Sequence, residues 1–350
     1  MCASSHPTIV IGVFAHNEER NISGTLRAMS RQTLLSPTDN GVSLLVLANG
    51  CRDGTCEAAS EALRELMPAA AENGLAGVVD IPEPGKSRTW NTFVHELVPA
   101  SAEYIVFTDA DISFPDTSTL MDLIEFLRAN SSVEVATSRP TKTIEIEKVS
   151  NPLDWLSRHV SRLTQSKAQH AIAGSLYCMR ASLAKRIVLP NGMLVEDGFI
   201  RIAVSTNSFT MPPNDDRIQR VPGARHVFHP CRGVLAYLRH ERRIVLGTLQ
   251  NFAVWDWIRE HSKGCVPSEL VSRMNASEPE WTIPLLKARA SRLGRRGMVL
   301  MAWEVGIGQL RRQRGARKVL MMPVAAARIV FSSVGGFMAL RAVRTGGIAW

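Results

Sequence analysis

Residues 104 to 111 read Tyr-Ile-Val-Phe-Thr-Asp-Ala-Asp, an apolar run that ends in two carboxylates, Asp109 and Asp111. The run predicts a buried strand. Each uncompensated buried ion costs on the order of several kcal/mol, so the pair should have a cation to neutralise it. Mg²⁺ and Mn²⁺ take a few carboxylate oxygens and fill their remaining positions with water and substrate phosphates. The stretch therefore predicts a hard-metal site that handles a diphosphate at the end of a strand.

The sequence around this stretch alternates short apolar runs with helix-period segments, which is typical of a mostly parallel α/β sheet. We expect strands over residues 8–14, 42–48, 78–81, 104–108 and 133–137. We expect helices over 58–66, 86–97 and 120–127, and one after Asn17, which should cap it, because Ile22, Leu26 and Met29 recur at helical spacing.

Polar residues follow three of these strands. They are His16-Asn17-Glu18 after the first strand, Asn49 after the second and the two aspartates after the fourth. In open α/β sheets, ligands bind outside the carboxyl ends of the strands. The sequence therefore predicts that these residues converge on one site.

The alternation weakens beyond residue 150. We expect a helix over 151–165, a strand over 172–179, a helix over 196–204 and a long, basic, partly amphipathic helix over 232–260. Two apolar stretches follow, 298–307 and 319–340, and the second contains Pro323, Arg328 and two glycines. A spanning helix needs about 20 mostly apolar residues without a central charge. We therefore favour a region that lies on a membrane or folds onto the body over a true span.

Composition and charge separate a near-neutral body from a basic tail. Hydrophobic content of 45% and charged content of 21% describe a globular chain of 350 residues. Residues 281–350 hold 13 Lys and Arg but one acid, Glu304, against a net charge of +9 for the whole chain. We expect this tail to meet an anionic membrane surface. We expect no nucleic acid partner, because the tail lacks interleaved aromatic residues for base stacking.

The cysteines and the first residues predict a cytoplasmic protein. The six cysteines form no Cys-x-x-Cys pair and no small secreted framework, so we interpret them as reduced thiols. Residues 1–7 lack a basic stretch followed by an apolar core, so we expect no signal peptide. With the basic tail, this predicts a cytoplasmic protein that lies peripherally on the inner face of the membrane.

Five short motifs carry a family resemblance over about residues 8 to 205. In chain order they are Ala15-His16-Asn17-Glu18, Ala48-Asn49-Gly50-Cys51-Arg52-Asp53-Gly54-Thr55, Gly85-Lys86 with Asn91, Asp109-Ala110-Asp111, and Leu194-Val195-Glu196-Asp197-Gly198. In this order and spacing, the chain resembles family 2 glycosyltransferases of the GT-A fold. The resemblance implies an α/β fold with a Rossmann-like, mostly parallel central sheet flanked by helices, extended by a helical basic C-terminal region.

The resemblance also implies a domain division and an activity. A catalytic domain would cover residues 1–230, with a nucleotide-sugar half (1–140) and an acceptor half (141–230), followed by the C-terminal region 231–350. The enzyme would move a sugar from a UDP- or GDP-sugar to a hydroxyl of a saccharide or a lipid-linked acceptor. A divalent metal, Mn²⁺ or Mg²⁺, would assist an inverting single displacement, with Asp197 as general base beside Glu196.

The resemblance assigns the donor-binding residues individually. His16 stands where the family often has Tyr and would stack on the base. Asn49 stands where Asp usually reads the base edge, and an amide both donates and accepts, which leaves uracil and guanine open. Lys86 would pair with phosphate. The expected donor-binding residues are Ala15, His16, Asn17, Glu18, Asn49, Gly50, Lys86, Asn91, Asp109, Arg242 and Arg243.

Metal ligands and a basic cluster complete the expected site. Asp109 and Asp111 would hold the metal, with His226 or His229 as a third ligand, and Arg239, Arg242 and Arg243 would face the diphosphate. Simpler interpretations stay open at this point: either histidine is structural, and the arginines form an exposed helix face. Likewise, Glu196-Asp197 caps a helix, Asn49 is a turn residue and Lys86 is solvated.

Three other classes of protein fit less of the sequence. A haloacid-dehalogenase-like phosphatase would use Asp109 as nucleophile and Asn214-Asp215-Asp216 as its later acidic motif, but that nucleophile normally follows the first strand. A non-enzymatic basic protein that binds membrane or nucleic acid leaves the carboxylates without a role. A dehydrogenase is disfavoured because no Gly-x-Gly-x-x-Gly follows the first strand.

Overall fold

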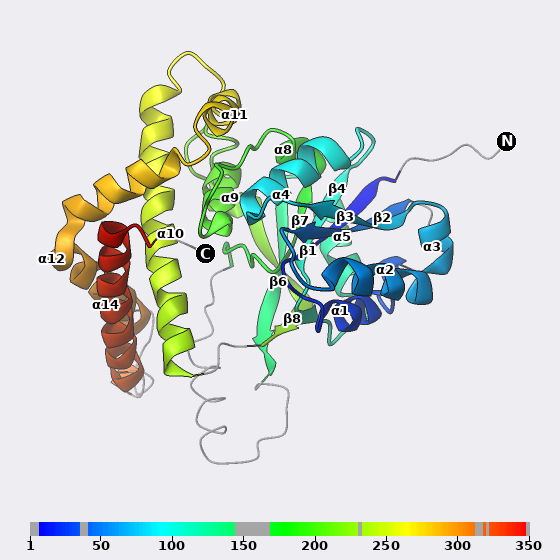
Figure 1. Cartoon of the computed structure of the whole chain (residues 1–350), viewed down its shortest axis with the longest axis horizontal. Helices are drawn as coiled ribbons and strands as arrows, with labels where there is room; N and C mark the ends of the chain where they lie inside the picture. The colour runs from blue at the N-terminus through cyan, green and yellow to red at the C-terminus, as the bar shows by residue number, and fades with distance from the viewer. Residues whose placement is uncertain are drawn as a thin grey trace.

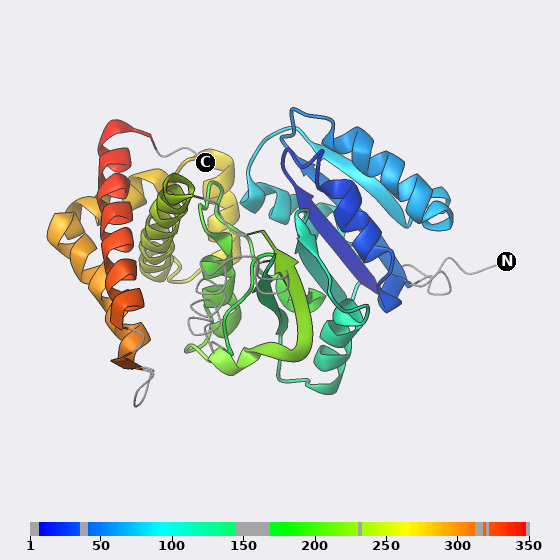
Figure 2. The ribbon, with the colours of Figure 1, turned by 90° about the horizontal axis from the view of Figure 1, so that it is seen from below.

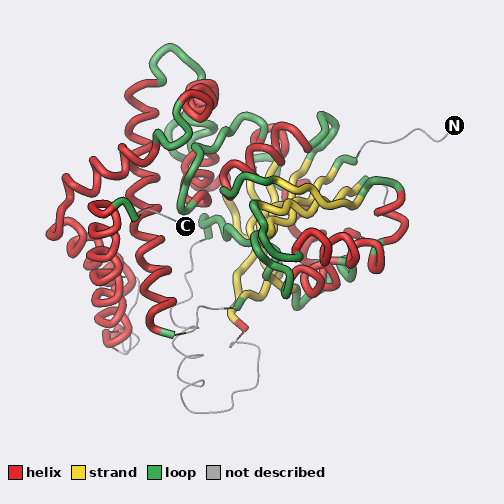
Figure 3. The backbone as a smooth tube through the Cα atoms, viewed as in Figure 1, coloured by secondary structure: helices red, strands yellow, loops and turns green. Residues whose placement is uncertain are grey.

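The computed structural model describes residues 7–35, 41–143, 169–229, 233–311, 318–319 and 322–347. Figure 1 shows a sheet flanked by helices, beside a group of long C-terminal helices, and Figure 3 separates helix from strand along the same view. The helix expected over 151–165 lies outside the described residues.

One mixed sheet of eight strands forms the body, in the order β3-β2-β1-β4-β7-β6-β8-β5. Its first half is parallel and consists of β1 (Ile9–Ala15), β2 (Val42–Asn49), β3 (Ala76–Ile81) and β4 (Tyr104–Asp109). Its second half contains both orientations and consists of β7 (Leu176–Arg180), β6 (Val135–Lys142), β8 (Ile218–Phe228) and β5 (Ile112–Ser113). The expected strands are all present, and β5 and β8 are additional.

The sequence pattern does not predict the strand β8, because Pro222 and Gly223 interrupt its apolar alternation. Proline lacks the N–H that a sheet ladder needs, and such residues sit at edges and irregular points. Gly223 has a φ of 92°, and the pairing of β8 with β6 shifts register between Thr137 and Arg139. His226 therefore lies within the sheet.

Two apolar layers cover the two faces of the sheet. Alternate residues of β1 separate them: Val10 and Phe14 belong to one buried cluster, and Ile9, Ile11 and Val13 to the other. The first layer includes α4 (Lys86–Thr92), α8 (Ala181–Ala184) and α9 (Glu196–Ser205). The second includes α1 (Ile22–Met29), α2 (Thr55–Leu66), α3 (Pro68–Glu72) and α5 (Thr119–Ala129). The result is a three-layer α/β/α arrangement.

Gly12 on β1 allows the first layer to pack closely. A Cβ at Gly12 would clash with the ring of Phe93, which is fully buried. The helix expected over 86–97 is α-helical only to Thr92, and Phe93–Leu97 form a π-helical turn that carries this ring. Such turns are rare and alter the path of a helix.

Asn17 does not cap the first helix, so that prediction is wrong. The helix α1 begins at Ile22 after Asn21. Asn17 adopts the left-handed conformation, with a φ of 56°, which asparagine tolerates better than most residues. Its side-chain oxygen accepts a hydrogen bond from the backbone N–H of Arg52 at 2.8 Å, so it joins two loops.

The C-terminal part consists of α10 (Val234–His261), α11 (Pro267–Ser277), α12 (Thr282–Arg311), which is kinked at Gly294, and α14 (Met322–Thr345). Figure 2 shows α10, α12 and α14 side by side. A Cβ on Gly335 of α14 would clash with Glu241 of α10, and Ser332 donates a hydrogen bond to Glu241 at 2.8 Å. One face of α14 therefore packs on the protein.

Within the described residues, α14 is the one helix with the length and apolar composition needed to cross a membrane. A core helix of a soluble protein can meet the same criteria. A third of its apolar window, 33%, is buried inside the protein.

Candidate active site

The carboxyl ends of β1, β2 and β4 meet at one edge of the sheet. These strands run parallel, and Ala15 pairs with Ala48 while Phe14 pairs with Asp109. The motifs that follow the strands therefore begin side by side, as expected for a ligand site in an open α/β sheet.

Hydrogen bonds join the first motif to the second. Nδ1 of His16 lies 2.6 Å from the backbone oxygen of Asn49, and the backbone N–H of Glu18 donates to Thr55 Oγ1 at 2.8 Å. Gly50 has a φ of 57°, and a Cβ there would clash with Pro84. Glycine at this turn thus allows the second and third motifs to approach each other.

Asn49 joins the second motif to the third. Its side chain is buried, and its Oδ1 accepts a hydrogen bond from the backbone N–H of Gly85 at 2.7 Å. An aspartate would accept the same bond, but asparagine keeps an NH₂ group that donates. Asn49 is therefore more than a turn residue.

Lys86 joins the third motif to the fourth and fifth. Its Nζ lies 2.7 Å from Asp109 Oδ1 and 3.0 Å from Glu196 Oε1, and the three side chains are 27%, 28% and 13% exposed. Burial acts to lower the pKa of Lys86, but the two carboxylates outweigh it and raise that pKa. The alternative of a solvated lysine is wrong, because Lys86 ties two carboxylates together.

Replacing Lys86 by methionine should destabilise the protein at neutral pH. It leaves two partly buried carboxylates without their cation, at a cost of about 1–3 kcal/mol after allowance for their exposure. The loss should shrink as the pH falls and these carboxyls protonate, because a neutral carboxyl needs no cation. Thermal unfolding from pH 4 to 8 measures it. A Lys86→Met variant as stable as the parent at pH 7 would show that the ion pairs of Lys86 do not stabilise the folded protein.

An acidic cluster forms around the Asp-x-Asp turn. Burial raises the pKa of Glu18, and Asp111, Asp109 and Asp53 add to this effect while Asn21 opposes it. Burial also raises the pKa of Asp109, with Lys86 opposing and Glu196 and Asp111 adding. Like charges that lie close together raise each other's pKa in this way. The edge of the sheet therefore attracts a cation.

Thr25 holds the Asp-x-Asp turn in place. Its hydroxyl lies 2.6 Å from the carbonyl oxygen of Ala110 and 3.0 Å from that of Ile112. Ala110 is buried while Asp111 is exposed. The turn thus presents Asp111 to solvent.

The described residues contain no group of three or more His, Cys, Asp or Glu side chains arranged to hold a metal ion. A Mg²⁺- or Mn²⁺-type site needs only one or two carboxylates together with substrate phosphates. Neither expected histidine joins the aspartates in such a group.

His226 has a structural environment, which corrects its expected role as a metal ligand. The residue is fully buried, and both ring nitrogens lie 2.7 Å from serine hydroxyls, those of Ser138 and Ser175. Burial lowers its pKa to about 4, so the ring is neutral. Because both nitrogens have partners, neither is free for a metal. His229 is exposed, with Nδ1 3.1 Å from Thr143 Oγ1.

Asp197 and Glu196 occupy the first turn of α9, and their pKa values are shifted in opposite directions. Burial, with Glu196 adding, raises the pKa of Asp197 to about 6, although Lys86, Gly198 and Arg243 oppose it. Burial would raise the pKa of Glu196 too, but Lys86 and further contacts lower it overall. Adjacent carboxyls whose pKa values are driven apart are typical of acid–base sites. Gly174 lies against Asp197: a Cβ there would sit 3.2 Å from Oδ2.

Glu196 and Asp197 also lie where they can cap the helix α9, and this role is compatible with acid–base chemistry. Oδ1 of Asp197 accepts the backbone N–H of Gly198 at 2.7 Å, in the first turn of the helix. A carboxylate there is also favoured by the positive end of the helix dipole.

Three residues of α10 that the sequence analysis did not single out hold this turn. Gln250 accepts the backbone N–H of Leu194 at 2.9 Å, and Asn251 donates to the carbonyl of Val195 at 2.9 Å. A Cβ at Gly247 would clash with Val195. Gln250 and Asn251 follow Gly247 at spacings of three and four, so a small residue and two amides share one face of a basic helix. This pattern is the signal that could have predicted their role.

The three arginines of the basic cluster on α10 lie in different surroundings. Arg243 lowers the pKa of both Glu196 and Asp197, so it lies within electrostatic reach of the site. The backbone nitrogen of Arg242 lies against Gly335 of α14, and its Nε is buried without a partner among the described residues. Arg239 is exposed. Among the described contacts of these three arginines, only those of Arg243 reach Glu196 and Asp197.

Asn91 is engaged in structure, which corrects its expected role in donor binding. Its Nδ2 donates to the carbonyl of Leu189 and its Oδ1 accepts the N–H of Leu189, both at 2.8 Å. Both ends of the amide are therefore occupied by one backbone position 98 residues away.

We predict that Asn91→Ala lowers the free energy of unfolding by about 1–3 kcal/mol, because the backbone N–H of Leu189 loses its partner. Donor affinity should stay within about threefold of the parent value, a shift smaller than one lost hydrogen bond. Urea unfolding and calorimetric donor titration provide the two readouts. Unchanged stability with a much weaker donor affinity would restore the expected binding role.

The geometry defines a class of site. An acidic edge of a Rossmann-like sheet attracts cations, and beside it burial raises the pKa of the Asp197 carboxyl to about 6. The model of the glycosyl transferase family 2 matches residues 10–185. The chain belongs to this family, and the family, the fold class and the enzyme class expected from the motifs are confirmed.

Two solved structures are similar to this chain at low identity, and the first, with a TM-score above 0.5, shows the same fold. The mannosyltransferase PcManGT from Pyrobaculum calidifontis, in complex with GDP-Man and Mn²⁺, is 18% identical with a TM-score of 0.51, covering 95% of this chain and 88% of that chain. Glucosyl-3-phosphoglycerate synthase from Mycobacterium tuberculosis, in complex with Mn²⁺, UDP and glucosyl-3-phosphoglycerate, is 20% identical with a TM-score of 0.45, covering 70% and 80%. No curated protein sequence matches the chain.

The phosphatase alternative does not fit the structure. Asp109 follows the fourth strand and is paired with Lys86, and Asp215 forms an ion pair with Arg201 at 2.7 Å. A phosphatase nucleophile would need an unshielded carboxylate oxygen at the phosphate.

Proposed function

We propose that the enzyme transfers a sugar from a UDP- or GDP-sugar to a hydroxyl group by an inverting, metal-assisted single displacement. The observation that carries this proposal is the linkage of all five motifs at one sheet edge, by Asn49, Lys86 and the loop hydrogen bonds. The GDP-Man and Mn²⁺ named for PcManGT support the donor class and the type of metal.

Asp111 and Asp109 would hold the metal ion, with Glu18 nearby. The fit rests on their chemistry: Asp111 is exposed and its charge raises the pKa of Glu18 and Asp109, and carboxylate oxygens gathered in this way suit a hard divalent cation. When bound, the ion neutralises the charge that develops on the departing diphosphate.

Asp197 would accept the proton of the acceptor hydroxyl. A general base works best with a pKa near the working pH, and its burial meets that condition. Lys86 lowers the pKa of Glu196, opposes the rise in the pKa of Asp109, and holds α9 against the Asp-x-Asp turn. The ordering of these groups by Gln250 and Asn251 keeps the base in place before substrate arrives.

Thermal unfolding with a panel of UDP- and GDP-sugars, each with Mn²⁺, tests the donor assignment. A true donor binds only the folded form and raises the unfolding temperature. We expect one nucleotide class to stabilise the protein in a Mn²⁺-dependent way and to be hydrolysed slowly. No stabilisation and no hydrolysis with any member would refute the proposed activity.

We further propose a cytoplasmic protein whose C-terminal helices contact an anionic membrane, which suits a lipid-linked acceptor. Leu300 and Trp303 on α12 and Met322 on α14 are exposed, in a region with 13 basic residues and one acid. Apolar side chains among basic ones favour the interface of an anionic bilayer. Sedimentation with anionic vesicles at low and high salt tests this. Failure to sediment at low salt would refute it.

A further inference from the structure

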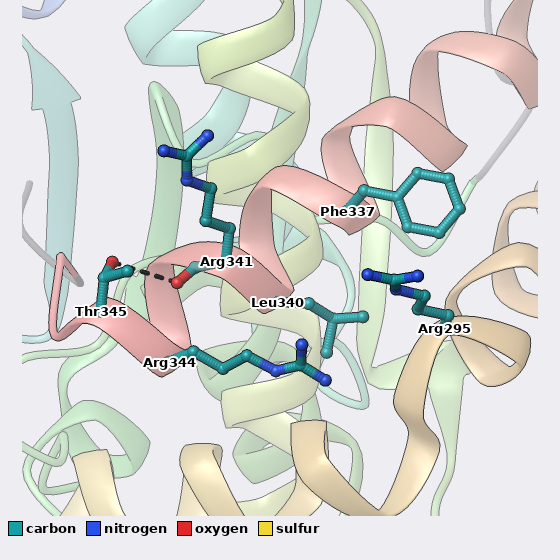
Figure 4. A pocket seen from close by; sticks show the side chains of 6 residues that line it. All are labelled: Arg295, Phe337, Leu340, Arg341, Arg344 and Thr345. Carbon is teal, nitrogen blue, oxygen red and sulfur yellow. Dashed lines mark hydrogen bonds between the residues drawn. The ribbon is translucent and has the colours of Figure 1, made fainter.

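A hollow of about 490 Å³ opens between two C-terminal helices. It is lined by Arg295 of α12 and by Phe337, Leu340, Arg341, Arg344 and Thr345 of α14. Half of these residues are arginines and none is acidic. Figure 4 shows the guanidinium groups of Arg295 and Arg344 on either side of Leu340, while Arg341 extends in another direction.

The positive charge of the hollow is not neutralised within the described part of the chain. None of its three arginines takes part in an ion pair there, and Glu304 is the one acid in residues 281–350. Like charges held together repel, so the hollow favours an anion. A planar guanidinium offers parallel N–H donors that match the oxygens of a phosphate.

An apolar stripe leads into the hollow along α14. Val330, Val334 and Phe337 are 60%, 38% and 43% exposed and follow one another at spacings of four and three. Arg341 and Arg344 continue the same spacing, so all five lie on one helix face. This face passes from hydrocarbon to positive charge, which suits a ligand with an apolar part and an anionic end.

The base of the hollow belongs to a buried cluster that reaches the segment before Glu196. Leu340 is 5% exposed and belongs to a buried cluster with Leu194 and Leu246. Leu194 lies two residues before Glu196, and Gln250 of α10 holds its backbone. A ligand in the hollow would therefore bind to the same packed unit that carries Asp197.

We propose that this hollow binds the phosphate group of an anionic amphiphile, with Arg295 and Arg344 as the main contacts and the hydrocarbon along the stripe. This inference deepens the proposed membrane contact and does not depend on the transfer reaction. Its phosphate could come from a bilayer lipid or from a soluble phosphate ester. The apolar stripe favours the lipid.

The test compares two double variants of equal charge. Arg295→Gln/Arg344→Gln removes the hollow's contacts, and Arg292→Gln/Arg328→Gln removes two exposed arginines from the same helices outside the hollow. Binding is measured with phosphatidylcholine vesicles that contain about 20 mol% phosphatidic acid, an anionic surface of moderate charge. We expect the hollow variant to bind at least about tenfold more weakly than the control, because both variants lose the same general attraction to an anionic surface but only the hollow variant loses charge-assisted hydrogen bonds to the phosphate. Equal losses would overturn a specific site and leave only general attraction to charge.

A second arm separates the sources of phosphate. Calorimetry with inorganic phosphate and glycerol 3-phosphate should show binding at least about tenfold weaker than binding to the vesicles, and Phe337→Ser should weaken only the vesicle binding. Equal affinity for soluble phosphate, with Phe337→Ser neutral, would overturn the amphiphile. Hydrolysis of the nucleotide sugar should be unchanged in the hollow variant, so failure of the site and failure of the proposed reaction appear in different measurements.

Discussion

Asp197→Asn should lower turnover by roughly 10²–10⁴-fold while leaving donor affinity nearly unchanged, because a positioned general base contributes about that much. The parent enzyme should show activity that rises with pH through about 6, as the Asp197 carboxyl ionises. The variant should lose that rise. Initial rates from pH 4.5 to 8 and a donor titration give both quantities. Near-normal turnover in the variant would refute the assignment of the base.

The same substitution should make the protein more stable. The folded pKa of Asp197 is raised above its unfolded value of 3.8, so ionisation costs stability as the pH rises through about 6. Asparagine removes this cost, and we expect a gain of about 1–3 kcal/mol above pH 6 and none at pH 4. Asp216→Asn, at a side chain 82% exposed, is the matched control and should change neither rate nor stability. A destabilised Asp197→Asn variant would show that the carboxylate is structural.

Asp111→Asn should lower metal-dependent turnover by roughly 10²–10⁴-fold, which corresponds to several kcal/mol of charge stabilisation. The apparent Mn²⁺ affinity should fall with it. Because Asp111 is exposed and repels Glu18 and Asp109, stability without metal should not decrease. Mn²⁺ titration of rate and unfolding temperature measures these effects. A variant that keeps the parent's Mn²⁺ dependence would place the metal elsewhere.

The parallel half of the sheet and the convergence of its motifs could be predicted from sequence. Each strand there is a continuous apolar run, and each motif begins where its run ends, so periodicity alone locates both. Asp109, Asn49 and Glu18 meet because parallel strands bring their carboxyl ends to one edge.

The contacts within the site could not be predicted, because they depend on tertiary packing. Nothing local in the sequence indicates that Asn91 pairs with the backbone of Leu189, or that His226 lies buried between two serines on a strand interrupted by proline. Lys86 was expected to face phosphate, and its position between Asp109 and Glu196 follows from the approach of α9. Long-range pairs of this kind are set by the fold.

Anomalous diffraction at the manganese edge, from crystals grown with Mn²⁺ and the preferred nucleoside diphosphate, locates the metal ion. We predict one strong peak beside Asp111, within bonding distance of the diphosphate oxygens, with Asp197 facing the sugar side of the site. A peak at His229 or elsewhere, with the nucleotide away from the Asp109–Asp111 turn, would contradict the account.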